Sequence, residues 1–157
     1  MELKRVVITG IGAISPLGAT ARETWEAVVA GKSGAAPITL FDASKFKTTF
    51  ACEVKEFDVS KYIDKKEARR LDRYAQFAMV AAEESIADSK LDVETVNKNR
   101  VGVIIASGIG GLGTFEEEVR GYNEESGPRF NPFFIPKMIS DISAGHVQLE
   151  KGFHGPN

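Results

Sequence analysis

Residues 100–113 read RVGVIIASGIGGLG, and this stretch decides the fold class. Its first part, residues 100–107, is a continuous apolar run of strand length, which is the pattern of a strand buried in a parallel sheet. The run leads directly into a glycine-rich turn, where a chain can leave a strand and enter a helix. The polar segment TFEEEVRGYNEESGPR (114–129) follows this turn. The stretch therefore predicts one strand–turn–helix passage of an α/β protein.

The N-terminal end of the chain has the same pattern. Residues 3–8 form an apolar run that predicts a buried strand, and a turn rich in glycine and proline follows it. A helix is then predicted over residues 20–30, because Thr20 is a good N-cap with Glu23 three residues later, and Gly31 follows the last turn. Two strand–turn–helix passages imply an α/β fold.

Three further segments have readable periodicity. Residues 65–89 contain no Gly or Pro and place apolar side chains at helical spacing, so a single helix is predicted there. Residues 38–57 alternate β-forming side chains with turn residues, which predicts a short strand or hairpin. Residues 133–152 fit one or two short helices, separated by Pro136 and Gly145.

Composition excludes several classes of function. Twenty basic and twenty-two acidic side chains give a net charge of -2, so no overall field favours nucleic acid or an anionic membrane. No apolar run reaches membrane length and the N-terminus lacks a signal-peptide pattern, so a cytoplasmic protein is expected. The single cysteine, Cys52, cannot form an internal disulfide and is expected to pack as a small apolar side chain. His146 and His154 have no metal-ligand spacing, and no metal or cofactor is expected.

Several motifs together resemble the β-ketoacyl-acyl-carrier-protein synthase family. They occur in the family's order and spacing: RVVITGIGAISPLG (5–18), SGIGGLG (107–113), GPRFNPFFIPKMISD (127–141), AGHV (144–147) and GFHGPN (152–157). The intervening KKEARRLDRYAQFA (65–78) is similar to the elongating, type II members. The resemblance covers nearly the whole chain.

This resemblance implies a thiolase-like fold, with the chain covering most of the N-terminal half of a duplicated, layered α/β/α/β/α architecture. Residues 1–157 would form an N-terminal ketoacyl synthase domain that is truncated before the catalytic cysteine. The implied enzyme is a homodimeric acyltransferase that condenses an acyl thioester with malonyl-carrier protein, by decarboxylation, in fatty-acid elongation. Its partners are acyl carrier protein and acyl and malonyl thioesters. Cys52, His146 and His154 match no catalytic position of the family, so the chain is expected to be inactive alone.

The resemblance also implies two groups of site residues. Lys66, Arg69 and Arg70 would dock the acidic carrier protein, and their spacing places them with Arg73 on one face of the expected helix. A solvated charged face is the alternative. The second group would border the acyl pocket or the dimer contact: Ile109, Phe133, Phe134 and Ile135. Core packing is the alternative for the aromatic residues of this group.

Two rival functions remain open at this point. Gly108, Gly110 and Gly113 form GxGxxG after an expected strand, which is compatible with a dinucleotide-binding oxidoreductase domain. Against it, no second strand ending in an acidic residue follows about twenty positions later. The other rival is a non-catalytic carrier-binding protein of the same fold. The preferred acyl chain and the choice between fatty-acid and polyketide synthesis are not determined by the sequence.

Overall fold

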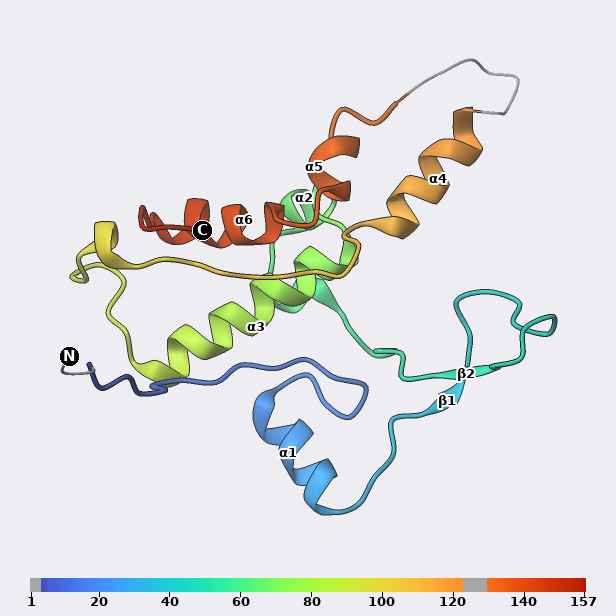
Figure 1. Cartoon of the computed structure of the whole chain (residues 1–157), viewed down its shortest axis with the longest axis horizontal. Helices are drawn as coiled ribbons and strands as arrows, with labels where there is room; N and C mark the ends of the chain where they lie inside the picture. The colour runs from blue at the N-terminus through green and yellow to red at the C-terminus, as the bar shows by residue number, and fades with distance from the viewer. Residues whose placement is uncertain (1–3, 123–129) are drawn as a thin grey trace. The chain divides into compact units, whose positions relative to one another are not determined.

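The computed structural model describes residues 4–122 and 130–157, and Figure 1 shows the order of the elements along the chain. The chain divides into two compact units. The first comprises Met1–Asp58 and Glu83–Lys90, and the second comprises Val59–Ala82 and Leu91–Asn157.

The first unit contains helix α1 (Ala21–Val29), which confirms the helix predicted near the N-terminus. The hydroxyl of Thr20 accepts a hydrogen bond from the Glu23 amide at 3.1 Å, as an N-cap does. The Glu23 carboxylate in turn accepts from the amide of Ala19 at 2.8 Å. Gly31, just beyond the helix, has a φ of 68°, which is the left-handed conformation that glycine adopts most easily.

Carboxylates hold the loop before α1. These carboxylates belong to Glu84 and Asp88, near the end of helix α3 (Arg73–Ser89). The helix belongs to the first unit only from Glu83 onward. Glu84 accepts from the amides of Ala13 and Ala21, at 2.8 and 2.9 Å. Asp88 accepts from the amide of Ile11 at 2.9 Å. The loop therefore owes its position to side chains that lie more than sixty residues away in sequence.

A short antiparallel hairpin confirms the prediction for residues 38–57 in type, although it begins slightly earlier. Strand β1 (Ala36–Pro37) pairs with β2 (Phe50–Ala51), in the register Ala36 with Ala51. The expectation that Cys52 is packed is wrong, because its side chain is exposed. In an edge hairpin of this kind, alternate residues point to solvent, and Cys52 follows the half-buried Ala51.

The second unit corrects the prediction of one helix over residues 65–89. Helix α2 (Lys65–Ala68) ends before α3 begins, and it is preceded by the 3₁₀ turn η1 (Val59–Lys61). The junction is stabilised by side chains. Asp72 accepts from the Tyr74 amide at 3.2 Å, and the Gln76 side-chain amide donates to the Ala68 carbonyl at 2.9 Å. Satisfied backbone groups make the break between the two helices stable.

Four more helical elements complete the described part of the second unit. They are the 3₁₀ turn η2 (Lys98–Arg100) and the helices α4 (Leu112–Tyr122), α5 (Phe134–Met138) and α6 (Ile142–Lys151). Of the one or two short helices expected near the C-terminus, two are present, but Pro136 and Gly145 lie inside them and do not separate them. Proline fits in the first turn of α5 because an amide there has no intrahelical acceptor.

The core of the second unit is small. It is formed by Leu71, Ala75, Met79 and Val147, which bring α3 and α6 together. The half-buried Val103 and Ile105 pack against this cluster. Among the described residues, no helix is both long enough and apolar enough to cross a membrane.

The two predicted buried strands are not strands in this structure. Residues 4–8 and 101–107 have no strand assignment, and the described residues form no parallel sheet. Ile104 is 89% exposed although its neighbours Val103 and Ile105 are half-buried, so only one face of this extended segment is covered. Its backbone forms hydrogen bonds with residues 155–156, at 2.9 and 3.0 Å. An apolar run predicts extended backbone, but a strand also needs a paired neighbour, which the run itself does not contain.

Candidate functional site

The glycine-rich loop before α4 is seated on the end of α5. Gly110 has a φ of 83°, and a Cβ at this position would overlap the carbonyl oxygen of Met138. The amide of Gly111 donates to the same carbonyl at 3.1 Å, and the Gly110 amide donates to the hydroxyl of Ser107 at 3.0 Å. The close approach to α5 explains the glycines at positions 110 and 111 without a dinucleotide ligand, whereas a Cβ at Gly108 or Gly113 would meet nothing within 4 Å. The loop presents Ile109, which is 68% exposed.

Asp72 connects this loop to the junction between α2 and α3. Its carboxylate accepts from the Thr114 hydroxyl at 2.5 Å, and a Cβ on Gly111 would lie 2.9 Å from the same oxygen. Next to it, the Tyr74 hydroxyl donates to the Ile139 carbonyl, beyond the end of α5. Burial raises the pKa of Tyr74, and the nearby Asp72 adds to this shift, so the hydroxyl keeps the proton that it donates. Three segments of the unit thus meet at one point.

The predicted FFIP residues divide between packing and exposure. Phe134 stacks on Phe115 and Phe130, with ring centroids 6.2 and 6.3 Å apart. Phe133 lies under the guanidinium of Arg70, 5.1 Å from its ring centroid. Ile135 is 51% exposed. The structure therefore packs the half-buried Phe134 against neighbouring rings and leaves Ile135 available for a contact.

The basic residues do not share one helix face, and that prediction is wrong. Lys66 lies on α2, Arg69 is the C-cap of α2, and Arg73 is the first residue of α3. The break therefore divides them between two helices. Arg70 pairs with Glu67 at 2.9 Å, and Arg73 lies over the ring of Phe77 at 5.1 Å.

Two cavities on the second unit have opposite linings. We call the first, of about 720 Å³, the basic cavity; it is lined by Val59, Ser60, Lys65, Ala68, Arg69, Leu71, Gln76 and Lys137. We call the other, of about 650 Å³, the acidic cavity, because Asp64, Glu67 and Glu150 line it together with Arg70 and His146. Leu71 lines both cavities. The consecutive residues Arg69 and Arg70 therefore face different environments.

Helix α6 carries two buried polar groups that the sequence does not single out. Ser143 is fully buried, and within the described part of the chain neither its hydroxyl nor the Nε2 atom of His146 has a hydrogen-bond partner. Burial lowers the pKa of His146, because the charged imidazolium loses hydration, and the carboxylate of Glu67 only partly opposes this. His146 therefore favours its neutral form in the folded protein.

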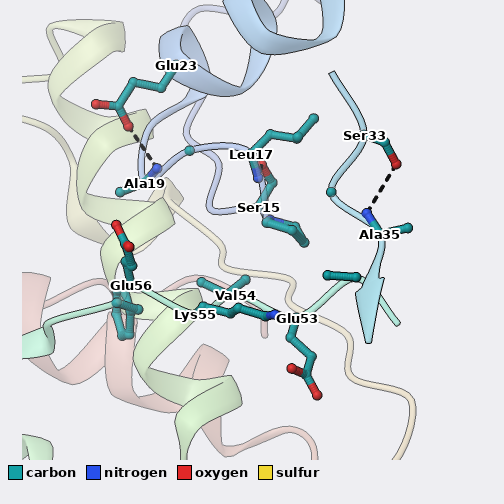
Figure 2. Close-up of a pocket in the computed structure, with 15 residues that line it drawn as sticks. Ser15, Leu17, Ala19, Glu23, Ser33, Ala35, Glu53, Val54, Lys55 and Glu56 are labelled. Atoms are coloured by element: carbon teal, nitrogen blue, oxygen red, sulfur yellow. Dashed lines mark hydrogen bonds between the residues drawn. The ribbon is translucent and has the colours of Figure 1, made fainter. Parts of the chain in front are cut away.

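The first unit has a cavity of about 450 Å³ that holds none of the predicted site residues. It is lined by the turn at residues 15–19, by Glu23, and by segments 33–36 and 53–57 (Figure 2). Several of its polar side chains bind groups of the unit itself. Glu23 binds the Ala19 amide, and hydrogen bonds from Thr39 lower the pKa of Glu53. Nothing in this lining indicates a particular ligand.

Sequence reasoning missed two cations of the basic cavity, Lys65 and Lys137. Lys137 is the only charged residue in FFIPKMIS (133–140), and a lone charge in an apolar segment could have marked it as a candidate. The sequence does not show that Lys137 lines the same cavity as the residues of α2. The predicted Arg69 lines the basic cavity, whereas the predicted Lys66 lines neither the basic nor the acidic cavity.

Comparison with known proteins gives a family match over almost the whole chain. The family model described as "Beta-ketoacyl synthase, N-terminal domain" matches residues 3–157. The chain is 41% identical over 157 residues to a 3-oxoacyl-[acyl-carrier-protein] synthase 2 of Synechocystis sp.. It is 44% identical over 154 residues to a synthase of the same name from Staphylococcus aureus. The chain spans 38% and 37% of the lengths of these two relatives.

Solved ketosynthases have the same chain path. A type II polyketide ketosynthase in complex with its acyl-carrier protein, bound to the hexaketide, matches with a TM-score of 0.77 and 29% identity, over 97% of this chain and 40% of that one. The ishigamide ketosynthase/chain length factor matches with a TM-score of 0.84 and 24% identity, over 96% and 38%. These matches confirm the thiolase-like α/β fold, although the described residues form no complete sheet.

Proposed function

Because the chain belongs to the β-ketoacyl synthase family, we propose that it supplies the N-terminal part of a 3-oxoacyl-[acyl-carrier-protein] synthase. The observation that carries this proposal is the 41% and 44% identity to two synthases of that name, over 100% and 98% of this chain. The reaction is the decarboxylative condensation of an acyl thioester with malonyl-carrier protein. Fatty-acid elongation is favoured over polyketide synthesis, because the polyketide ketosynthase is only 29% identical.

The residues of this chain would position the reactants. Condensation needs a thiolate that attacks a thioester and hydrogen-bond donors that stabilise the enolate left by decarboxylation. Cys52, His146 and His154 match none of the family's catalytic positions, so we assign the chain no catalytic residue. Ile109 is proposed to border the acyl chain, since its loop is fixed on α5 by Gly110.

The dimer contact is proposed for Phe133, Phe134 and Ile135. Of these, Ile135 has the most suitable exposure, because Phe134 already packs against Phe115. Other uncovered apolar residues, including Trp25 at 67% exposed, support a homodimer or a larger assembly. Sedimentation equilibrium tests this, and a stable monomer would contradict it. The proposed location is the cytoplasm, which fractionation of the source cells would test.

A chimeric enzyme tests the proposed activity. Residues 1–157 would replace the matching 37% of the Staphylococcus aureus synthase, whose remaining residues are kept. We expect the chimera to condense acyl- and malonyl-carrier protein. The reason is that 44% identity over this region should preserve the core and the contact of the glycine-rich loop with α5. The measurement is the formation of 3-oxoacyl-carrier protein from radiolabelled malonyl-carrier protein.

The 157-residue chain alone is the control, and we expect it to form no product and to hold no acyl group on Cys52. A folded chimera that binds acyl substrate but forms no product would contradict the proposed function. Turnover by the chain alone would contradict the assignment of no catalytic residue to it.

Carrier docking is proposed for Lys66, Arg69 and Arg70, since Lys66 and Arg69 are exposed cations near the α2–α3 junction. Reversing both arginines to Glu should slow association with acyl carrier protein at least about tenfold and flatten its salt dependence, because complementary charge acts mainly on encounter. Surface plasmon resonance at 0.05 and 0.3 M salt measures both quantities. Equal rates and equal salt slopes for the variant and the wild type would refute the docking assignment.

A further inference from the structure

One carboxylate joins the starts of two helices in the second unit. Asp72 lies just before α3, and one of its oxygens accepts from the Tyr74 amide at 3.2 Å, in the first turn of that helix. The other oxygen accepts from the hydroxyl of Thr114 at 2.5 Å, in the first turn of α4. Both Asp72 and Thr114 are half-buried, so solvent only partly competes for this bond.

The first turn of α4 and the glycine-rich loop before it form one hydrogen-bonded piece. The amides of Leu112 and Phe115 donate to the carbonyls of Gly110 and Gly111, each at 3.0 Å. Gly111 is buried, and a Cβ on it would lie 2.9 Å from the Asp72 oxygen that binds Thr114. A carboxylate that holds Thr114 therefore also fixes the position of the loop.

The loop that carries Ile109 has two attachments to other elements. The first is the backbone contact of Gly110 and Gly111 with the Met138 carbonyl of α5. The second is the bond between Asp72 and Thr114. Only the second consists of side chains, so it can be removed without altering the backbone of the loop.

Capping of α3 does not account for the bond to Thr114. The N-cap role of Asp72 needs one oxygen, and the Tyr74 amide already binds it. The second oxygen is used for a short, charge-assisted bond to an element forty-two residues away. Such a bond restrains the distance between the two elements, and that distance determines how far the loop can move away from a ligand beside Ile109.

We propose that Asp72 and Thr114 are positioning residues that limit the length of the acyl chain by holding the loop of Ile109. The inference rests on the proposed function, in which Ile109 borders the acyl chain. Asp72 and Thr114 act through Ile109 and do not contact the substrate. A pocket excludes extra methylene groups only where its wall does not recede, so the enzyme accepts longer chains when the bond is lost.

Thr114→Val tests this, because it removes the hydroxyl, keeps the shape of the side chain and leaves the bond between Asp72 and Tyr74 intact. The measurement is kcat/KM of the chimera with the Staphylococcus aureus synthase, for hexadecanoyl- and dodecanoyl-carrier protein. We expect the ratio of the two values to rise about fivefold, since part of the discrimination between chain lengths is lost. Thr114→Ser keeps the hydroxyl and should leave the ratio within about twofold of the wild type.

Two further variants separate positioning from general stability. Thr95→Val removes the same kind of bond, from a hydroxyl to the Asp92 carboxylate at 2.8 Å, in a turn that carries no proposed site residue. Val147→Ala opens a cavity in the core and lowers the melting temperature. Both should leave the ratio within about twofold of the wild type.

Hydrogen exchange provides a measurement that does not depend on turnover. The Gly111 amide is protected by its bond to the Met138 carbonyl. In Thr114→Val its exchange rate should rise at least about threefold, because the loop opens more often, and in Thr114→Ser it should not change.

The outcomes distinguish this inference from the proposed function. If the chimera condenses and Ile109→Ala raises the ratio but Thr114→Val does not, the inference is wrong and the proposed function stands. Equal shifts in Thr114→Val and Val147→Ala would also overturn the inference, as would an unchanged ratio in Ile109→Ala. A wild-type chimera that forms no product would overturn both. If Thr114→Val does not fold, Asp72→Asn replaces it, and its weaker neutral acceptor should raise the ratio about twofold to threefold.

Discussion

Replacing Gly110 with alanine is expected to destabilise the protein by about 3 kcal/mol or more, which belongs to the large-effect tail of single substitutions. Two costs add together. A side chain at a φ of 83° costs about 1 to 2 kcal/mol by itself. The new Cβ would also overlap the carbonyl oxygen of Met138, which is backbone and cannot rotate away. The loop would have to leave α5, and the hydrogen bond from Gly111 to Met138 would be lost.

Urea denaturation followed by circular dichroism measures this change. The matched control is Gly113→Ala, three residues further on, where a Cβ would meet nothing within 4 Å and the residue lies inside α4. That change should be neutral or stabilising by up to about 1 kcal/mol, since alanine is the better helix former. Similar unfolding midpoints for the two variants would show that the glycine loop is not seated on α5 as described.

Replacing Glu84 with alanine is expected to cost about 2 to 4 kcal/mol, because two amides lose a charged acceptor. The carboxylate accepts from Ala13 and Ala21, at 2.8 and 2.9 Å, and the second of these amides lies in the first turn of α1. An anion at a helix N-terminus is favoured by the helix dipole, so its loss also weakens α1. Thermal unfolding by differential scanning calorimetry gives the change.

The control for Glu84 is Glu26→Ala, on α1 itself. Glu26 makes an exposed pair with Arg22 at 3.4 Å, which should be worth less than about 0.5 kcal/mol. A Glu84 variant that melts with the control would mean that the loop before α1 is held by other contacts. Glu84→Gln should fall between the two, since the amide keeps one acceptor oxygen but adds a donor that faces backbone amides.

The sequence predicted those elements whose causes are local. Helix α1 follows from Thr20, Glu23 and Gly31, which act within one or two turns of it. The break between α2 and α3 was not predictable in the same way. Asp72 is held there by Thr114, forty-two residues away, and nothing in the periodicity of residues 65–89 carries that contact. The extended segment at residues 101–107 likewise shows its apolar character in sequence, but not which partner would pair with it.

The site was predicted in part for the same reason. The family resemblance led to Arg69 and to the loop that carries Ile109, both of which stand in short, recognisable motifs. The resemblance did not distinguish Arg69 from Arg70, because the sequence alone does not show which residues surround each of two adjacent arginines. Their different surroundings depend on Glu67 and Phe133 on one side and on Lys137 on the other.

The two cavities give the surface of the second unit a positively charged region next to a negatively charged one. Cations gather in one cavity and three carboxylates line the other, with Leu71 common to both linings. A negatively charged partner would thus experience a torque as well as an attraction, since one of its sides is pulled while the adjacent side is pushed away. The partner would begin to rotate into its bound orientation before contact. A larger fraction of encounters would therefore lead to binding. A neutral molecule would receive no such guidance, and a basic molecule would be turned the opposite way.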